Sequence, residues 1–93
     1  MVIGTLQLEL RFHKPRSLKE KRVLLKSLTA RIRKQFNVSI AELDGMDVWQ
    51  RSRVAIAAVG RGRSSVNRNL DYVLDFIHEE RQIEITKQQM ELL

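Results

Sequence analysis

The feature of this sequence that most constrains its fold is a pattern that occurs twice: a strand-like stretch, a helix-like stretch and a second strand-like stretch. In the first cycle, residues 2–12 alternate between apolar and polar side chains, residues 18–34 place leucine and isoleucine at helical spacing, and residues 37–43 alternate again. In the second cycle, an apolar, partly β-branched run at residues 53–59 and a short stretch at residues 83–86 flank another helical period. The predicted order is β-α-β-β-α-β.

Capping signals mark where the two helices begin. Residues 17–20 have the sequence of a capping box, in which the Ser17 hydroxyl caps the helix and Glu20 reaches back to the amide of Ser17. The second helix is expected to begin after a cap at Ser64 or Ser65 and to continue to about Glu80.

This order of elements predicts an α+β fold, a ferredoxin-like sandwich with two helices on one face of a four-stranded antiparallel sheet. We expect residues 1–93 to form a single domain, because a chain of this length buries one core. Right-handed crossovers place the first and third strands at the centre of the sheet and the second and fourth at its edges. We also expect the two central strands to run parallel, so that both helix N-termini emerge at the same end of the sheet.

The composition excludes several classes of protein. The chain has no cysteine, which excludes disulfides, a thiolate zinc site and a cysteine nucleophile, and is typical of a reducing compartment. No apolar run approaches the roughly 20 residues that span a bilayer, and the N-terminus lacks the basic region of a signal peptide. We therefore expect a cytoplasmic protein without a membrane partner.

The positive charge is concentrated in the first half of the chain. Residues 1–45 carry ten Lys or Arg and four Asp or Glu, whereas residues 46–93 carry seven of each, so the first half holds the entire excess of six. Such asymmetry favours an anionic partner such as RNA, DNA or a phosphate-bearing ligand. The alternative is a charged surface that only keeps the protein soluble.

Basic side chains recur in both connections that lead into a helix and along the first helix. On that helix, four of them fall within about 60° of one another and form a ridge suited to a nucleic-acid backbone, although ordinary snorkelling side chains would look the same. If the helix N-termini share one end of the sheet, the two connections meet there. Lys21 and Arg68 lie near these helix starts, whereas Arg81 and Lys87, far along the chain from both, are expected to matter little for binding. The predicted anion-binding residues are Lys14, Arg16, Lys19, Arg22, Lys26, Arg33, Arg61 and Arg63.

Motifs for catalysis or cofactor binding are absent. The segment Gly60–Ser65 contains glycines before a helix but matches neither common phosphate-binding loop, and neither histidine has a nucleophile at a motif spacing. Glu42, Asp44 and Asp47 offer oxygen ligands for a hard cation, but turn formation is the commoner role of such residues. We expect no enzyme activity, no catalytic residue, no cofactor and no metal.

The sheet face turned away from the helices is predicted to be small-sided and flat. It carries Thr5, Gln7 and Glu9 from the first strand and Ala55, Ala57 and Val59 from the third. It lacks the aromatic side chains with which RNA-recognition motifs stack bases. Trp49 is expected to cover an open end of the core, with base stacking as the alternative. This face suits packing against a second subunit, which makes a homodimer or another protein complex the alternative function.

Four stretches in order resemble the bacterial YlxP-like family, a family of unknown function. They are Ser17–Arg22, Lys26–Leu28, Phe36–Glu42 and Asp47–Gln50, and together they span most of the chain. The resemblance implies a ferredoxin-like fold. Members are often encoded beside translation-initiation and ribosome-binding factors, which implies a link to RNA or the ribosome. The leading hypothesis is therefore a non-catalytic protein that contacts RNA or the ribosome through its basic first helix and the basic loops at the two helix N-termini.

Overall fold

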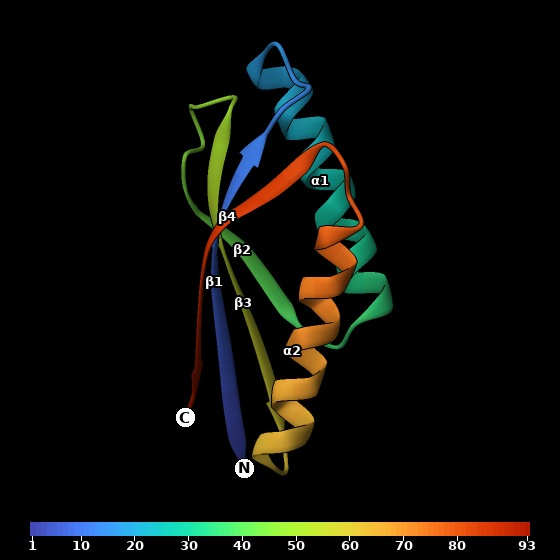
Figure 1. Ribbon diagram of the computed structural model, residues 1–93, viewed down its shortest axis with the longest axis vertical. Helices are drawn as coiled ribbons and strands as arrows, with labels where there is room; N and C mark the ends of the chain where they lie inside the picture. The colour runs from blue at the N-terminus through green and yellow to red at the C-terminus, as the bar shows by residue number, and fades with distance from the viewer.

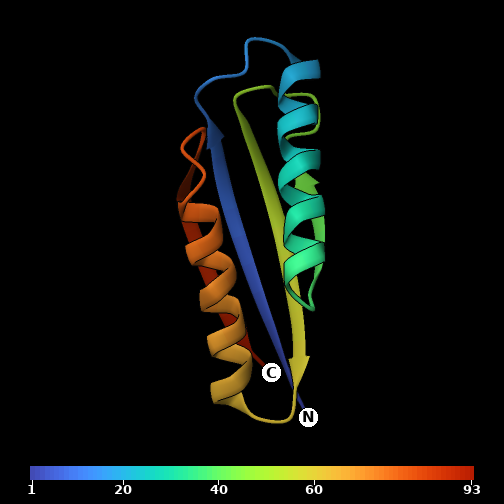
Figure 2. The same ribbon diagram turned by 90° about the vertical axis from the view of Figure 1, so that its right-hand side faces the viewer.

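The computed structural model describes residues 1–93 as one four-stranded sheet covered by two helices. Both helices lie side by side on the same face of the sheet, as Figures 1 and 2 show. The strand order is β2-β3-β1-β4 and every neighbouring pair is antiparallel, which confirms the predicted ferredoxin-like α+β architecture and the predicted edge strands. The elements are β1 (Val2–Phe12), α1 (Leu18–Gln35), β2 (Ser39–Asp44), β3 (Arg51–Gly60), α2 (Arg63–His78) and β4 (Ile83–Leu92).

The prediction that the two central strands run parallel is wrong. β1 and β3 pair antiparallel, from Val2 opposite Gly60 to Arg11 opposite Arg51. The reason lies in the connections: the helical crossover α1 returns the chain so that β2 runs in the direction of β1, and the following hairpin reverses it. The two helices therefore begin at opposite ends of the sheet, α1 at the top and α2 at the bottom of Figure 1.

The core lies between the sheet and the two helices. Alternate residues of β1 are buried there, as the period-two pattern predicts, and each buried leucine contributes about 2 kcal/mol. Gly4 lets α2 approach the sheet closely, because a Cβ at this position would lie 2.5 Å from Val66 Cγ1 and 2.8 Å from Leu70 Cδ1. The buried hydrophobic residues are Leu6, Leu8, Leu10, Phe12, Leu25, Leu28, Ile32, Ile40, Val54, Ile56, Ala58, Val66, Leu70, Val73, Leu74, Ile77 and Ile83.

Two element boundaries differ in instructive ways from the predicted ones. The N-cap of α2 is Gly62 rather than Ser64 or Ser65, and no side chain caps the helix; the Ser65 hydroxyl instead donates to the Gly62 carbonyl. β4 continues to Leu92, although its second half is mostly polar, because the long β1 offers pairing positions as far as Gly4. An edge strand can carry polar side chains that a central strand would bury.

Candidate nucleic-acid interface

Helix α1 carries the net charge of the whole chain. It contains seven Lys or Arg and one Glu, an excess of six that equals the formal net charge of the protein. The remainder of the chain holds ten residues of each sign and is balanced. Neither α1 nor α2 is long and apolar enough to cross a bilayer. The charge asymmetry of the sequence is therefore the property of a single element.

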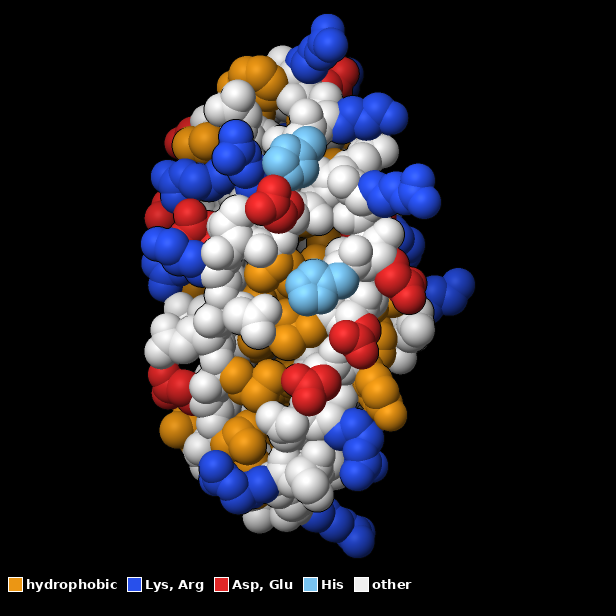
Figure 3. Space-filling view, in the orientation of Figure 1, with side chains coloured by type: hydrophobic (Ala, Val, Ile, Leu, Met, Phe, Trp, Pro, Cys, Tyr) orange, Lys and Arg blue, Asp and Glu red, His pale blue; other side chains and the backbone are white.

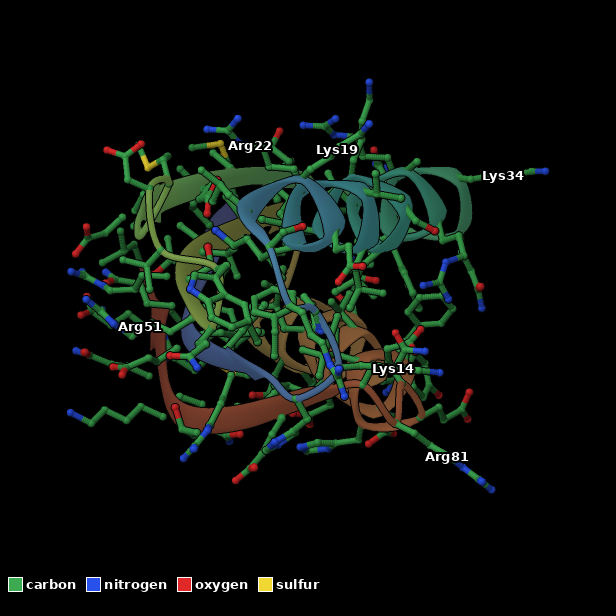
Figure 4. The ribbon with its side chains drawn as sticks, turned by 90° about the horizontal axis from the view of Figure 1, so that it is seen from above. Lys14, Lys19, Arg22, Lys34, Arg51 and Arg81 are labelled. Carbon is green, nitrogen blue, oxygen red and sulfur yellow. The ribbon has the colours of Figure 1, made fainter.

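Four of these basic side chains form a ridge along one flank of α1. Leu25, Leu28 and Ile32 turn the neighbouring side of the helix to the core, about 120° from the ridge at 100° per residue. In Figure 4, Lys19 and Arg22 extend from α1 on the side of β2, whereas Lys34 points away from the sheet. The ridge extends about 21 Å along the helix axis, because 14 residues separate its ends. The basic ridge comprises the exposed residues Lys19, Arg22, Lys26 and Arg33.

Two other basic residues of α1 have partners within the chain, Lys21 in the interior and Arg31 at the surface. Lys21, which the sequence groups with the basic helix start, is fully buried and cannot contact an external anion. The Arg31 guanidinium pairs with the Glu80 carboxylate at 2.8 Å and lies 5.8 Å from the centre of the Phe76 ring. The basic surface of α1 is therefore narrower than its composition indicates.

Buried Lys21 ties the start of α1 to the β2–β3 hairpin. Its Nζ donates to the Glu42 carboxylate and to the Gly45 carbonyl, both at 2.9 Å, and the buried Ser52 hydroxyl donates to the same Glu42 oxygen. Gly45 has a φ of +89°, and a Cβ there would lie 2.9 Å from the Arg51 carbonyl oxygen, so the turn requires glycine. This network fixes the hairpin connection beside the first turn of α1.

The same network accounts for the carboxylates that the sequence offered as oxygen ligands. Glu42 is paired with Lys21, and the Asp44 side chain accepts the backbone N–H of Gly45. No group of three or more His, Asp or Glu side chains is placed to hold a metal ion. In the connection between β2 and β3, Met46 and Trp49 are exposed to 49% and 37%, and neither belongs to the hydrophobic core or to the side chains packed against it.

The β1–α1 connection is held in place from both sides. Ser17 caps α1 by accepting the Glu20 N–H at 3.2 Å, as predicted, but the Glu20 carboxylate accepts the backbone N–H of Arg16 rather than that of Ser17. His13 hydrogen-bonds to Glu84 of β4 at 2.7 Å. The exposed Lys14 and Arg16 therefore sit on an ordered connection that leads into the basic ridge.

Arg61 and Arg63 do not join this surface. β3 ends beside the beginning of β1, with Gly60 opposite Val2, so both arginines lie at the end of the sheet where α2 begins. The predicted convergence of the two basic connections depended on parallel central strands and is wrong for that reason. The structure unites Lys14 and Arg16 with the ridge and separates Arg61 and Arg63 from it.

The α1 end of the sheet instead gathers three arginines that the sequence analysis missed. Arg51 of β3 lies opposite Arg11 of β1 in the strand register at this end. The His13 N–H donates to the Gln82 carbonyl, which brings the connection containing Arg81 beside Lys14. Figure 4 looks onto this end and shows Lys14 and Arg81 on the same side of it. Arg81, although far along the chain from the start of α1, is therefore close to it in space. With β3 antiparallel to β1, Arg11, Arg51 and Arg81 all lie at the end of the sheet where α1 begins.

The open face of the sheet is more charged than the predicted strip of small residues. The Arg53 guanidinium donates to the Gln7 side chain at 2.9 Å, and Lys87 Nζ lies 3.9 Å from the Glu9 carboxylate. A shallow depression remains between β1, β3 and β2, lined in part by the side chains of Thr5, Ala41, Ala55 and Ala57. The apolar part of this face extends from this depression to the end of the sheet, where the exposed Ile3 and Val59 pair across β1 and β3.

Comparison with known proteins places this architecture in a family. The model of a family described as "Protein of unknown function (DUF503)" matches residues 3–90. The chain is 41% identical over 85 residues to the uncharacterised protein YlxP of Bacillus subtilis (strain 168), a match that covers 91% of this chain and 92% of the relative. The likeness extends over both helices and all four strands, and the chain belongs to the DUF503 family, whose members include YlxP-like proteins.

Proposed function

We propose that this protein is a non-catalytic RNA-binding protein whose interface is the basic ridge of α1 together with Lys14 and Arg16. The observation that carries the proposal is the concentration of the entire net charge on one exposed helix. RNA is proposed rather than DNA because the family resemblance implies a link to the ribosome.

The arrangement of the ridge suits a phosphate backbone. One nucleic-acid strand advances about 3.4 Å per nucleotide, so the length of the ridge matches roughly six nucleotides. The only acidic residue of α1, Glu20, is engaged with the Arg16 backbone and does not interrupt the ridge. Arg33 donates to the Ile40 carbonyl at 2.9 Å, which holds its guanidinium near the C-terminal end of the ridge.

The chemistry of the ridge predicts affinity without strong sequence preference. Lysine and arginine contacts to phosphates position a protein on a nucleic acid, whereas contacts to base edges read its sequence. Each neutralised phosphate releases counterions, so binding should weaken steeply with salt. The exposed Trp49 beside this end is the one aromatic ring available for stacking on an unpaired base.

A salt titration with two matched variants tests the proposal. The double variant Arg22→Gln/Lys26→Gln changes the ridge, and Arg61→Gln/Arg63→Gln removes the same charge at the opposite end of the sheet. The probe is purified ribosomal RNA, followed by fluorescence anisotropy between roughly 50 and 200 mM salt. We expect the ridge variant to lower the slope of log affinity against log salt by about 1.4 to 1.8, which corresponds to two lost phosphate contacts.

The control variant distinguishes a defined interface from diffuse attraction. Arg61→Gln/Arg63→Gln should leave most of the slope intact, because these residues are remote from the ridge. Equal losses in both variants would contradict the proposal, as would the absence of binding at low salt. Equal affinity for a DNA duplex of matched length would mean that the ridge binds nucleic acid in general and has no preference for RNA.

A further inference from the structure

The two outer strands of the sheet differ in length and in whether a side chain hydrogen-bonds to the backbone of the strand. β2 has six residues, and the Arg33 guanidinium from α1 donates to its Ile40 carbonyl. β4 has ten residues and pairs only with β1, and no hydrogen bond reaches its outer edge between Glu84 and Leu92. A long free edge of this kind is a template for a further strand.

The hydrogen bonds within the sheet determine which backbone groups of β4 point outward. Ile3 and Leu93 exchange both of their backbone hydrogen bonds, at 3.0 and 2.7 Å. Bonded and non-bonded pairs alternate in an antiparallel ladder, and the register of β4 on β1 is regular from Leu92 back to Lys87. The N–H and C=O groups of Gln88, Met90 and Leu92 therefore point to the free edge.

The side chains of this segment alternate in character as well as in direction. Those on the open face are polar or charged: Lys87, Gln89 and Glu91 lie opposite Glu9, Gln7 and Thr5. The Lys87 side chain is 80% exposed, and its pair with Glu9 is loose.

The helix side of the same segment carries Gln88, Met90 and Leu92, of which Gln88 is polar and exposed. Met90 and Leu92 lie half-buried, opposite Leu6 and Gly4, and pack against the core. Figure 3 shows the hydrophobic side chains that gather between β4 and α2. A strand added to this edge would cover them with its own side chains.

We propose that β4 pairs with β4 of a second copy of this chain, antiparallel about a two-fold axis at Gln89, to form a continuous eight-stranded sheet. Any axis that passes through a residue matches outward donors with outward acceptors on both strands, and the axes nearest the middle of the segment pass through Gln88, Gln89 or Met90. With the axis at Gln89, Lys87 faces Glu91 of the partner subunit, and Glu91 faces the partner's Lys87. The other two registers place Lys87 opposite the partner's Gln89 or the partner's Leu93.

The geometry of this pairing makes a symmetric, closed dimer. A two-fold axis perpendicular to the sheet keeps the helices of both subunits on one face and joins the same edge of each subunit. Met90 then packs beside the partner's Gln88 over the apolar seam along α2. The assembly does not depend on RNA binding, but it would place one basic ridge toward each outer end of the enlarged sheet.

A cysteine scan tests the position of the axis directly, because the chain has no cysteine of its own. Gln89 on the axis forms a non-hydrogen-bonded pair with itself, whose Cα atoms are separated by about 4.5 Å, within the range of a disulfide. We expect Gln89→Cys to form a covalent dimer under mild oxidation and Gln88→Cys to form much less. Ala57→Cys, on the open sheet face, serves as the matched control and should remain monomeric on a non-reducing gel.

Charge reversal tests the register independently in sedimentation experiments. Lys87→Glu places like charges opposite each other at two symmetric positions and should raise the dimer dissociation constant about tenfold or more. Glu91→Lys should do the same, and the double variant Lys87→Glu/Glu91→Lys should restore the wild-type value. Circular dichroism of each variant confirms that it is folded, and either single reversal suffices if the other fails to fold.

Three outcomes would overturn the proposal. The first is a wild-type protein that sediments as a monomer at high micromolar concentration. The second is dimerisation that both single reversals leave unchanged. The third is efficient cross-linking of Ala57→Cys without that of Gln89→Cys, which would assign self-association to the open face instead.

Discussion

The two ends of the sheet each present a helix N-terminus beside basic side chains, but they are built differently. At the α1 end, Ser17 caps the helix, Glu20 holds the Arg16 backbone and Lys21 reaches into a buried network. At the α2 end, Gly62 is the N-cap, no side chain caps the helix and the first turn has no acidic residue. Arg63 at that end faces the helix dipole without any compensating group.

At the α1 end, caps and buried hydrogen bonds accompany the cations, whereas at the α2 end no such contacts accompany them. A cation at a helix N-terminus costs about 0.3 to 1 kcal/mol when exposed. The α1 end carries the greater number of cations, and it is the end where caps and buried hydrogen bonds offset that cost. The α2 end has fewer cations and fewer supporting contacts, so the cost of its cations is not offset by a cap or by buried hydrogen bonds.

The buried network gives the largest expected effect. Lys21→Ala should lower the free energy of unfolding by about 2 to 3 kcal/mol, because it leaves the Glu42 carboxylate and the Gly45 carbonyl without their shared donor. This range lies below that of a fully buried pair, because the Glu42 side chain is 24% exposed. Urea unfolding followed by circular dichroism measures the loss.

The α2 end supplies the control for this experiment. Arg63→Ala removes an exposed cation and should change the unfolding free energy by about 0.5 kcal/mol at most. A double-mutant cycle on Lys21 and Glu42 should give a coupling energy of about 1 to 2 kcal/mol. A loss at Lys21 no larger than that at Arg63 would show that the two ends are equally supported.

The capping box gives a smaller effect at the same end. Ser17→Ala removes the acceptor of the Glu20 N–H and should lower the unfolding free energy by about 1 kcal/mol. Ser65→Ala, which loses only a bond to the Gly62 carbonyl, is the matched serine change at the α2 end and should cost less. Equal midpoints in urea for the two variants would contradict the assignment of Ser17 as the functional cap.

The sequence predicted the order of the elements because that order is written in local periodicity. The alternation of β1 and the spacing of Leu25, Leu28 and Ile32 are short-range patterns, and both are confirmed. For β4 the sequence predicts residues 83–86 and offers an extension toward Met90 only as an alternative, because the polar residues of its second half are held in a strand by pairing with β1, a contact distant in sequence. Pairing of this kind leaves no local signal on an edge strand.

The site was predicted in part for a related reason. Membership of Lys19, Arg22 and Lys26 in one ridge follows from helical geometry alone. The buried role of Lys21 does not, because lysine is rarely buried and its partners lie on the hairpin more than twenty residues away. The position of Arg81 beside Lys14 depends on the direction of β3. With β3 parallel to β1, as the sequence analysis expected, the connection that contains Arg81 would lie at the opposite end of the sheet from Lys14.

The smallest expected effect comes from adding a cap to α2, which has none, and comparing the gain in stability with the loss when the cap of α1 is removed. Gly62 has a φ of −136° and a ψ of 159°, which any residue adopts, and no atom lies within 4 Å of a Cβ at this position. Gly62→Asp should therefore supply the absent cap and a negative charge near the dipole, and raise the unfolding free energy by about 0.5 kcal/mol. Ser17→Gly at the α1 end is the converse change and should lower it by a few tenths of a kcal/mol. Thermal unfolding of both variants measures the pair. A destabilised Gly62→Asp protein would mean that this end uses its bare helix N-terminus for a purpose that a side-chain cap obstructs, and the two ends would then have to be regarded as alike.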